Sequence, residues 1–156
     1  MLTLQQATDR LKFMTASTSE PTLDADAITE LLAQAKRFNF WTTATGVAVG
    51  DVIQPTTANG HRYVCTEAGT TGATEPTWPT SRDGLIGDGT ATFQEVGPAF
   101  PEQWDLRRAA HLGWLRKAAQ IAGDYNFSVD GQSFSRSQAV THCMEMASRF
   151  APLTVA

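Results

Sequence analysis

A glycine- and threonine-rich segment in the middle of the chain is the feature that most restricts its fold. Residues 41–96 make up 56 of the 156 positions, yet they hold 8 of the 12 glycines, 13 threonines and no lysine. Their two arginines stand against six acidic residues, a net charge of −4, whereas the flanks carry ten basic and ten acidic residues. This change in composition predicts a small domain inserted into a host of a different kind.

Apolar residues at helical spacing predict two helices before the segment. The first covers about 4–14, and Thr3 and Gln6 have the spacing of a capping box, in which each side chain satisfies a backbone N–H of the first turn. The second covers about 24–38, and Asp24 at its start matches the positive end of the helix dipole.

Two further helices are predicted after the segment. The third begins after Pro101 and reaches about Ala122, and its apolar residues cover two faces. Such a helix either lies at the centre of a bundle or buries one face against another subunit. The fourth covers Ser135 to Phe150, with Ser135 and Gln138 as a second capping-box pair.

The inserted segment has the pattern of short strands. Alternating residues at 47–53, 61–66 and 90–96 predict strands, Asn59-Gly60 predicts a tight turn, and 69–82 is expected to be a long loop. The expected core of this small domain is aromatic and consists of Trp41, Tyr63, Trp78 and Phe93.

These patterns together predict an α+β fold. A bundle of four helices, formed by residues 1–40 and 97–156, is interrupted by a small antiparallel β domain at 41–96.

Composition excludes several classes of protein. A net charge of −4 argues against binding nucleic acid through a broad basic surface. No apolar stretch approaches the ~20 residues of a membrane span, so we expect no membrane association. The first residues lack the basic start and apolar stretch of a signal peptide. Cys65 and Cys143 are too few for a disulfide scaffold.

No pattern in the chain predicts catalysis, a metal site or a cofactor. The aspartates of 83–89 lack the ligand spacing of a calcium loop. His61 with Cys65, and His142 beside Cys143, lack the second pair of ligands that zinc requires. We therefore expect no catalytic residues, no metal ligands, no cofactor and no enzymatic activity.

Two kinds of binding site stay open as alternatives. Aromatic rings stack on sugars, which makes three residues of the insert candidates for a ligand site: Trp41, Tyr63 and Trp78. Four cations of the third helix could contact phosphates of DNA: Arg107, Arg108, Arg116 and Lys117.

Three stretches of the host resemble the head–tail connector (adaptor) proteins of tailed phages. The most specific runs from Phe127 to Ala147 and includes Asp130-Gly131-Gln132-Ser133-Phe134-Ser135-Arg136-Ser137-Gln138 before the last helix. The others are Trp104 to Ala119 and Thr22 to Ile28. The resemblance covers the host, about two-thirds of the chain.

The insert departs from the short linker that this family has between its second and third helices. Residues 69–79 and 88–93 resemble instead a small β module that recurs in phage virion proteins and is similar to chitin-type carbohydrate-binding modules.

The resemblance implies a structural protein of the virion neck, made in the host cytoplasm. Such adaptors form a homo-oligomeric, dodecameric ring beneath the portal protein and present a surface to the stopper or tail-terminator protein. DNA passes through the lumen of the ring without specific binding. The resemblance also implies that the end of the chain reaches the portal, through the uncharged tail Pro152, Leu153, Thr154, Val155 and Ala156.

Two other function classes remain as alternatives. In one, the insert is a module that binds a glycan or another virion protein, carried on a helical anchor. In the other, the chain is a DNA-handling protein such as a small-terminase-like ring, in which the cations of 107–117 contact phosphates.

Overall fold

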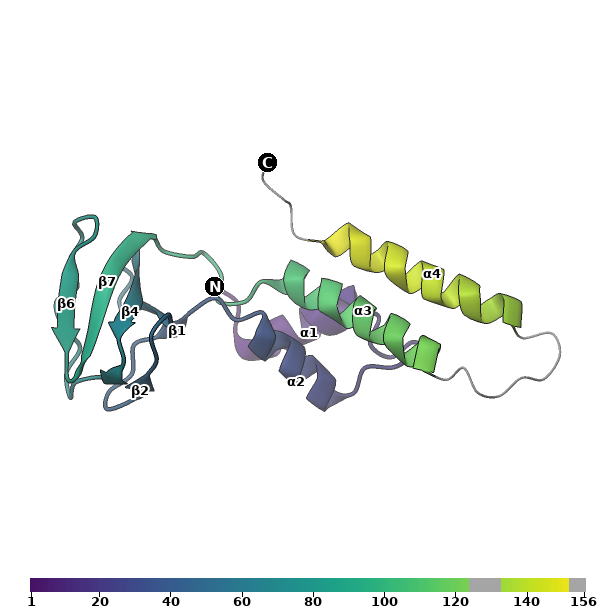
Figure 1. Ribbon diagram of the computed structural model, residues 1–156, viewed down its shortest axis with the longest axis horizontal. Coiled ribbons are helices and arrows are strands. Elements are labelled where there is room, and N and C mark those ends of the chain that lie inside the picture. The colour runs from purple at the N-terminus through teal and green to yellow at the C-terminus, as the bar shows by residue number, and fades with distance from the viewer. Residues whose placement is uncertain (124–132, 152–156) are drawn as a thin grey trace. The chain divides into compact units, whose positions relative to one another are not determined.

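The computed structural model describes residues 1–123 and 133–151, without the side chains of 133–136. The chain divides into two compact units. Residues Leu2–Lys36 and Trp104–Ala156 form one, called the helical unit below, and Arg37–Gln103 form the other, called the β unit. The fold is therefore α+β, with strands inserted between helices (Figure 1).

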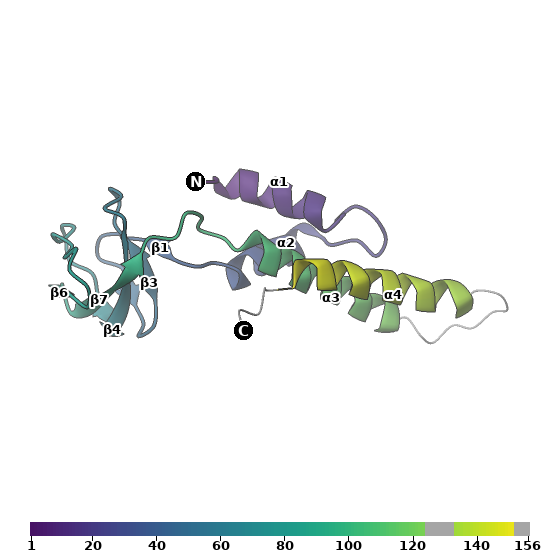
Figure 2. The same cartoon turned by 90° about the horizontal axis from the view of Figure 1, so that it is seen from above.

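The helical unit contains α1 (Leu4–Met14), α2 (Ala25–Gln34), α3 (Leu106–Gly123) and α4 (Ser133–Phe150). Figures 1 and 2 show α3 and α4 running side by side in opposite directions. One apolar core joins α1, α2 and the first part of α3, and a second joins α3 to α4 through Trp114, Ala118, Cys143 and Ala147. Thus α3 is the central helix of the unit, which explains its two apolar faces.

Capping interactions confirm the start of the first two helices. Thr3 and Gln6 form the predicted capping box, with Gln6 N–H donating to Thr3 Oγ1 (3.2 Å) and Thr3 N–H donating to Gln6 Oε1 (2.9 Å). The Asp24 carboxylate accepts a hydrogen bond from Ala27 N–H (2.7 Å) and is the N-cap of α2.

Three other helix limits differ from the prediction. The α2 helix ends at Gln34 because Lys36 already pairs with Trp104 as an isolated β-bridge. The α3 helix begins at Leu106, where the Asp105 carboxylate accepts from Arg108 N–H (3.1 Å). The second capping box is wrong, because α4 begins at Ser133 and Ser135 lies inside the helix.

The β unit contains a five-stranded sheet of order β1-β3-β4-β7-β6 and a two-stranded sheet, β2-β5. The strands are β1 (Asn39–Phe40), β2 (Gly46–Val47), β3 (Val52–Gln54), β4 (His61–Glu67), β5 (Gly69–Thr70), β6 (Leu85–Asp88) and β7 (Ala91–Pro98). The larger sheet is mixed rather than antiparallel, because β1 pairs with β3 in the parallel sense. The chain between them is long enough to return to the same end of the sheet.

The expected aromatic core of the β unit is confirmed. Its buried apolar residues are Trp41, Ile53, Tyr63, Cys65, Trp78, Ala91 and Phe93. Three strands are not predicted by the sequence patterns: β1, β6, and β5, which lies inside the expected loop.

The ends of the insertion are joined by backbone pairing. Arg37 N–H donates to Gln103 C=O (2.8 Å), Asp105 N–H donates to Ala35 C=O (2.8 Å), and Lys36 pairs with Trp104. Residues paired in this way have Cα atoms only about 5 Å apart, so a tight turn is able to connect Lys36 with Trp104.

Replacing residues 37–103 by a Gly/Ser linker of about four residues should therefore leave a folded helical protein. The far-UV circular dichroism of the shortened chain should show cooperative loss of helix on heating. Loss of the helical signal at room temperature would mean that the helical unit depends on the β unit.

A second prediction concerns the packing of α3 through a glycine. A Cβ built on buried Gly113 would lie 2.8 Å from Thr15 Cγ2 and 3.3 Å from Leu31 Cδ1. Gly113→Ala should therefore destabilise the protein by about 1–3 kcal/mol, although alanine is the better helix former. Gly123→Ala, in the same helix with open space around it, is the matched control. Urea unfolding of both variants measures the difference, and an equally stable Gly113→Ala would contradict the packing.

Candidate functional site

The three aromatic residues considered for sugar stacking are core residues. Tyr63 is 0% exposed, and Trp41 and Trp78 are each 9% exposed. The ring centroids of Tyr63 and Trp78 are 4.4 Å apart, and those of Trp78 and Phe93 are 5.6 Å apart. These rings pack in the core of the β unit, which leaves little of their faces exposed to a sugar.

Each polar atom of these rings has a partner within the β unit. Trp41 Nε1 donates to Asp88 Oδ2 (2.6 Å), Trp78 Nε1 to Glu75 Oε1 (2.9 Å) and the Tyr63 hydroxyl to Pro79 C=O (2.8 Å). Asp88, buried at 4% exposure, also accepts from Gly72 N–H (2.9 Å). Asp88 therefore joins two segments that are distant in the sequence, through the Trp41 indole and the Gly72 backbone.

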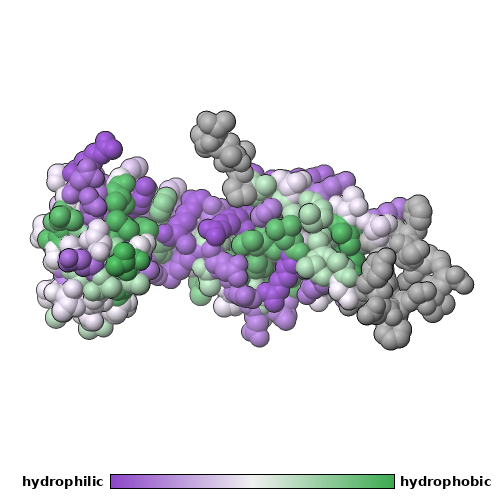
Figure 3. Space-filling model, viewed as in Figure 1, coloured by the Kyte–Doolittle hydropathy of each residue, from purple (hydrophilic) through white to green (hydrophobic). Residues whose placement is uncertain are grey.

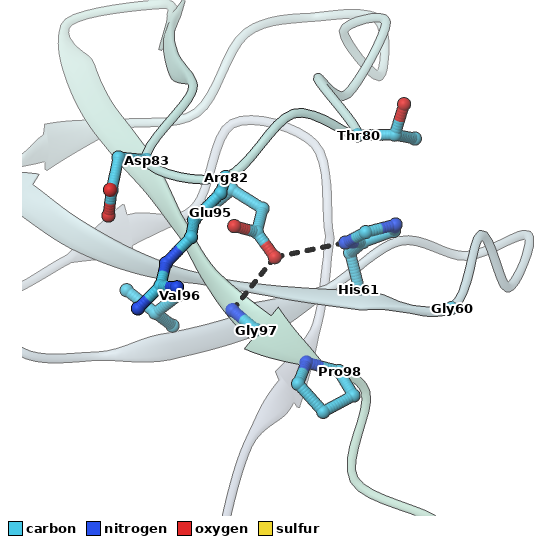
Figure 4. Close-up of a pocket in the computed structure, with 9 residues that line it drawn as sticks. All are labelled: Gly60, His61, Thr80, Arg82, Asp83, Glu95, Val96, Gly97 and Pro98. Atoms are coloured by element: carbon cyan, nitrogen blue, oxygen red, sulfur yellow. Dashed lines mark hydrogen bonds and ion pairs between the residues drawn. The ribbon is translucent and has the colours of Figure 1, made fainter.

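A cavity of about 680 Å³ lies where β4 begins and β7 ends. It is lined by Gly60, His61, Thr80, Arg82, Asp83, Glu95, Val96, Gly97 and Pro98. Figure 4 shows the Glu95 carboxylate between the His61 ring on one side and Arg82 and Asp83 on the other. The cavity brings together an imidazole, a guanidinium, two carboxylates and a hydroxyl.

The centre of the cavity is a hydrogen-bonded pair formed by His61 and Glu95. The His61 Nδ1 and Glu95 Oε1 atoms are 2.9 Å apart, and Gly97 N–H donates to the same oxygen (2.8 Å). The side chain of Glu95 is 3% exposed and that of His61 is 30% exposed. The pair thus joins a buried carboxylate to an imidazole that reaches solvent.

Local backbone geometry places this pair. Asn59 Oδ1 accepts from His61 N–H (3.0 Å) across Gly60, whose φ of +84° suits glycine. The register of β4 against β7 shifts between Arg62 and Tyr63, so that Tyr63 pairs with Glu95. This irregularity brings Glu95 and His61 together on adjacent strands.

The electrostatics of Glu95 favour its charged form. The hydrogen bond from His61 is the largest cause that lowers the pKa of the Glu95 carboxyl, and the N–H groups of Gly97 and Asp83 lower it further. Burial works in the opposite direction, and the net result is a lowered pKa. The second oxygen, Oε2, is buried and has no hydrogen-bond partner among the described residues.

A second cavity of about 320 Å³ is lined by Pro55, Thr57, Asn59, Glu75, Pro76, Trp78 and Thr80. Its carboxylate is already engaged, because Glu75 accepts from Thr56 N–H (2.9 Å), from the Thr56 hydroxyl and from Trp78. These hydrogen bonds lower the pKa of Glu75 against the opposing effect of burial. The cavity therefore offers few free polar atoms to a ligand.

Cys65 and His142, two of the residues considered for zinc, have other contacts in the structure. The Cys65 thiol is buried and donates to Glu67 C=O (3.1 Å), and burial raises its pKa. His142 packs its ring edge-to-face on Trp114, 5.8 Å between centroids. Within residues 1–123 and 137–151, no group of three or more His, Cys, Asp or Glu side chains could hold a metal ion.

Three of the four cations considered for DNA binding have partners within the helical unit. Lys117 is 1% exposed and donates to Ala16 C=O (2.6 Å) and Ser19 C=O (3.1 Å). Arg116 pairs with Glu30 (2.6 Å), and Arg107 donates to Arg149 C=O (3.2 Å). Burial lowers the pKa of Lys117.

Some expected features lie outside the described residues. These are the proposed portal-binding tail Pro152–Ala156 and residues 124–132, which include part of the resemblance to phage adaptors. In the part that is described, no helix is both long and apolar enough to cross a membrane.

Comparison of the chain with protein-family models, with curated proteins and with solved structures finds no match. The site must therefore be interpreted from its own geometry.

The His61–Glu95 pair predicts a pH dependence of stability. Because the pKa of Glu95 is lowered in the folded state, the carboxylate stabilises the fold above its unfolded pKa of about 4.3. This contribution is lost as the pH falls through the lower folded value. Glu95→Gln cannot titrate, so its β unit should show a smaller fall in melting temperature between about pH 6 and pH 3.

The melting temperature of the β unit at each pH is measured from the NMR amide peak intensities of β4 and β7 during heating. Asp83→Asn is the matched control, since it removes a carboxylate from the same cavity and asparagine tolerates the φ of +59° at this position. An equal loss of pH dependence in both variants would show that the effect does not come from the His61–Glu95 pair.

Proposed function

We propose that this protein is a structural adaptor of the phage virion neck, which forms a ring between the portal and the stopper or tail. The observation that carries the proposal is the position of the resembling segments in the helical unit. Trp104 to Ala119 leads into and forms most of α3, the helix on which the unit is built, and Thr22 to Ile28 forms the capped start of α2. The segments that resemble adaptors are thus those that organise the helical unit.

The surface of the helical unit supports association with other subunits. Phe13 is 87% exposed, Leu4 61% and Met144 49%, all large apolar side chains on helices. Figure 3 shows apolar side chains at the surface of this unit among polar ones. Exposed apolar side chains of this size are available to a neighbouring subunit or to the portal.

The charges support a channel through which DNA passes without binding. Lys117 is buried, and Arg107 and Arg116 are engaged within the chain. The β unit, Arg37–Gln103, holds three arginines against seven acidic residues. A neutral-to-acidic protein makes few contacts with phosphates, which favours the adaptor over the DNA-handling alternative.

A binding module carried on a helical anchor is the second candidate function. The cavity at His61 and Glu95 favours it, because it lies entirely within the inserted β unit. In this case the insert contacts a glycan or another virion protein, and the helical unit positions it.

The adaptor function predicts a ring that binds the portal. The full chain should form an oligomer of many subunits, by light scattering and electron microscopy, either alone or on isolated portal rings. Deleting residues 152–156 should leave the helical signal intact and weaken co-sedimentation with portal rings at least tenfold, because an apolar, uncharged tail is suited to a groove or sheet edge of a partner.

Leu85→Ser is the comparison variant and should leave co-sedimentation unchanged, since it removes an exposed apolar side chain from β6 of the β unit and not from the helical unit. If the truncated chain binds the portal with the same affinity as the full chain, the tail does not contribute to the attachment. A full chain that stays monomeric and does not bind the portal would contradict the adaptor function.

A further inference from the structure

We propose that the cavity at His61 and Glu95 is a binding site for an alkylguanidinium or alkylammonium group, held by the buried Glu95 carboxylate. The inference concerns the β unit alone and does not depend on the role of the helical unit. The shared chemistry is an organic cation with N–H donors, either a free small molecule or a basic side chain of another protein.

The unpaired oxygen of Glu95 is the first argument. Oε1 accepts two hydrogen bonds, from His61 and Gly97. The Asp83 N–H lies close enough to the carboxylate to lower its pKa, but Oε2 is buried and has no hydrogen-bond partner among the described residues. Buried polar atoms without a partner are rare, because each loses its hydration without replacement. An N–H donor arriving through the cavity would supply the missing bond.

The charge of the site selects a cation over an anion. The pKa of Glu95 is lowered, so the carboxyl is ionised at neutral pH. The cavity adds the Asp83 carboxylate and the Arg82 guanidinium, and the whole β unit has a net charge of −4. An anionic ligand would meet two carboxylates for one guanidinium, whereas a cation forms charge-assisted hydrogen bonds.

Arg82 is the cationic side chain of the cavity itself that could compete with an external cation for Glu95 Oε2. Its side chain is exposed, it lines the same cavity, and it supplies no hydrogen bond to Glu95 Oε2. Removing Arg82 should therefore favour an external cation. This distinguishes a ligand site from a carboxylate that serves only the chain's own arginine.

The second cavity provides an internal contrast. Glu75 has the same charge but three hydrogen-bond donors, from Thr56 and Trp78. A cation attracted only by the acidity of the β unit would approach both cavities. A cation that requires an unpaired oxygen would select the Glu95 cavity.

The test is an NMR titration of the full chain at pH 7 with ethylguanidinium chloride, and with ethylurea as its neutral isostere. Ethylguanidinium should cause saturable shifts of the His61, Asp83 and Gly97 amides, and ethylurea should not. Binding should weaken at least tenfold in Glu95→Gln and should be equal or tighter in Arg82→Ala. Amide shifts of Glu95→Gln outside the cavity verify that it is folded, and the isostere pair tests the proposal on the unaltered chain.

A second titration, with a peptide, distinguishes the two sources of the cation. Acetyl-Gly-Arg-Gly-amide that binds at least tenfold more tightly than ethylguanidinium would indicate a basic side chain of a protein, and equal affinity would indicate a small molecule. Equal shifts with ethylurea, no saturation with ethylguanidinium, shifts centred on Glu75 and Trp78, or loss of binding in Arg82→Ala would each overturn the proposal.

Discussion

The two-unit organisation depends on backbone pairing where the chain leaves and re-enters the helical unit. Lys36 and Trp104 are adjacent in space although 67 residues separate them, and Asp105 N–H bonds to Ala35 C=O. The end of α2 and the start of α3 are thereby fixed together, as a tight turn would fix them. Because the two ends of the inserted segment are paired with each other, the β unit can differ in composition from the helical unit without affecting the helical core.

Within each unit, buried polar groups determine which segments meet. In the helical unit, Lys117 of α3 donates to two carbonyls of the turn after α1, where Ala16 has a φ of +45°. In the β unit, Asp88 joins the Trp41 indole to the Gly72 backbone. Both groups have their partners, which is the condition under which burying a charge is tolerated. The Glu95 carboxylate differs from these two groups, because its Oε2 has no hydrogen-bond partner among the described residues.

Much of this architecture could be predicted from the sequence, because local patterns cause it. The capping box at Thr3, the Asp24 cap, the end of α4 at Phe150 and the aromatic core of the β unit follow from neighbouring residues or from simple burial. Two of the errors occur where pairing between distant segments determines the structure. The α2 helix ends early because Lys36 pairs with Trp104, and β1 makes the sheet mixed because it pairs with β3.

The candidate site lies beyond local patterns for the same reason. His61 and Glu95 are 34 residues apart, and neither belongs to a recognisable motif. The sequence pattern places His61 only with Cys65, a pair that lacks the further ligands zinc requires. The aromatic residues suggested a stacking site, but a unit of this size needs its large rings in the core. What the sequence did contain was the net charge of the insert and the Asn59-Gly60 turn that positions His61.

The unpaired oxygen Oε2 of Glu95 loses its hydration without replacement, and this cost opposes the stabilising hydrogen bonds to Oε1. An amide side chain at position 95 would remove the buried charge. A neutral glutamine would still accept from Gly97 while losing the stronger, charge-assisted bond to His61. The carboxylate therefore stabilises the His61 imidazole and leaves Oε2 unsatisfied at the same time. An unsatisfied Oε2 does not contribute to the stability of the fold, whereas a site that binds a cation requires an oxygen that is able to accept its N–H.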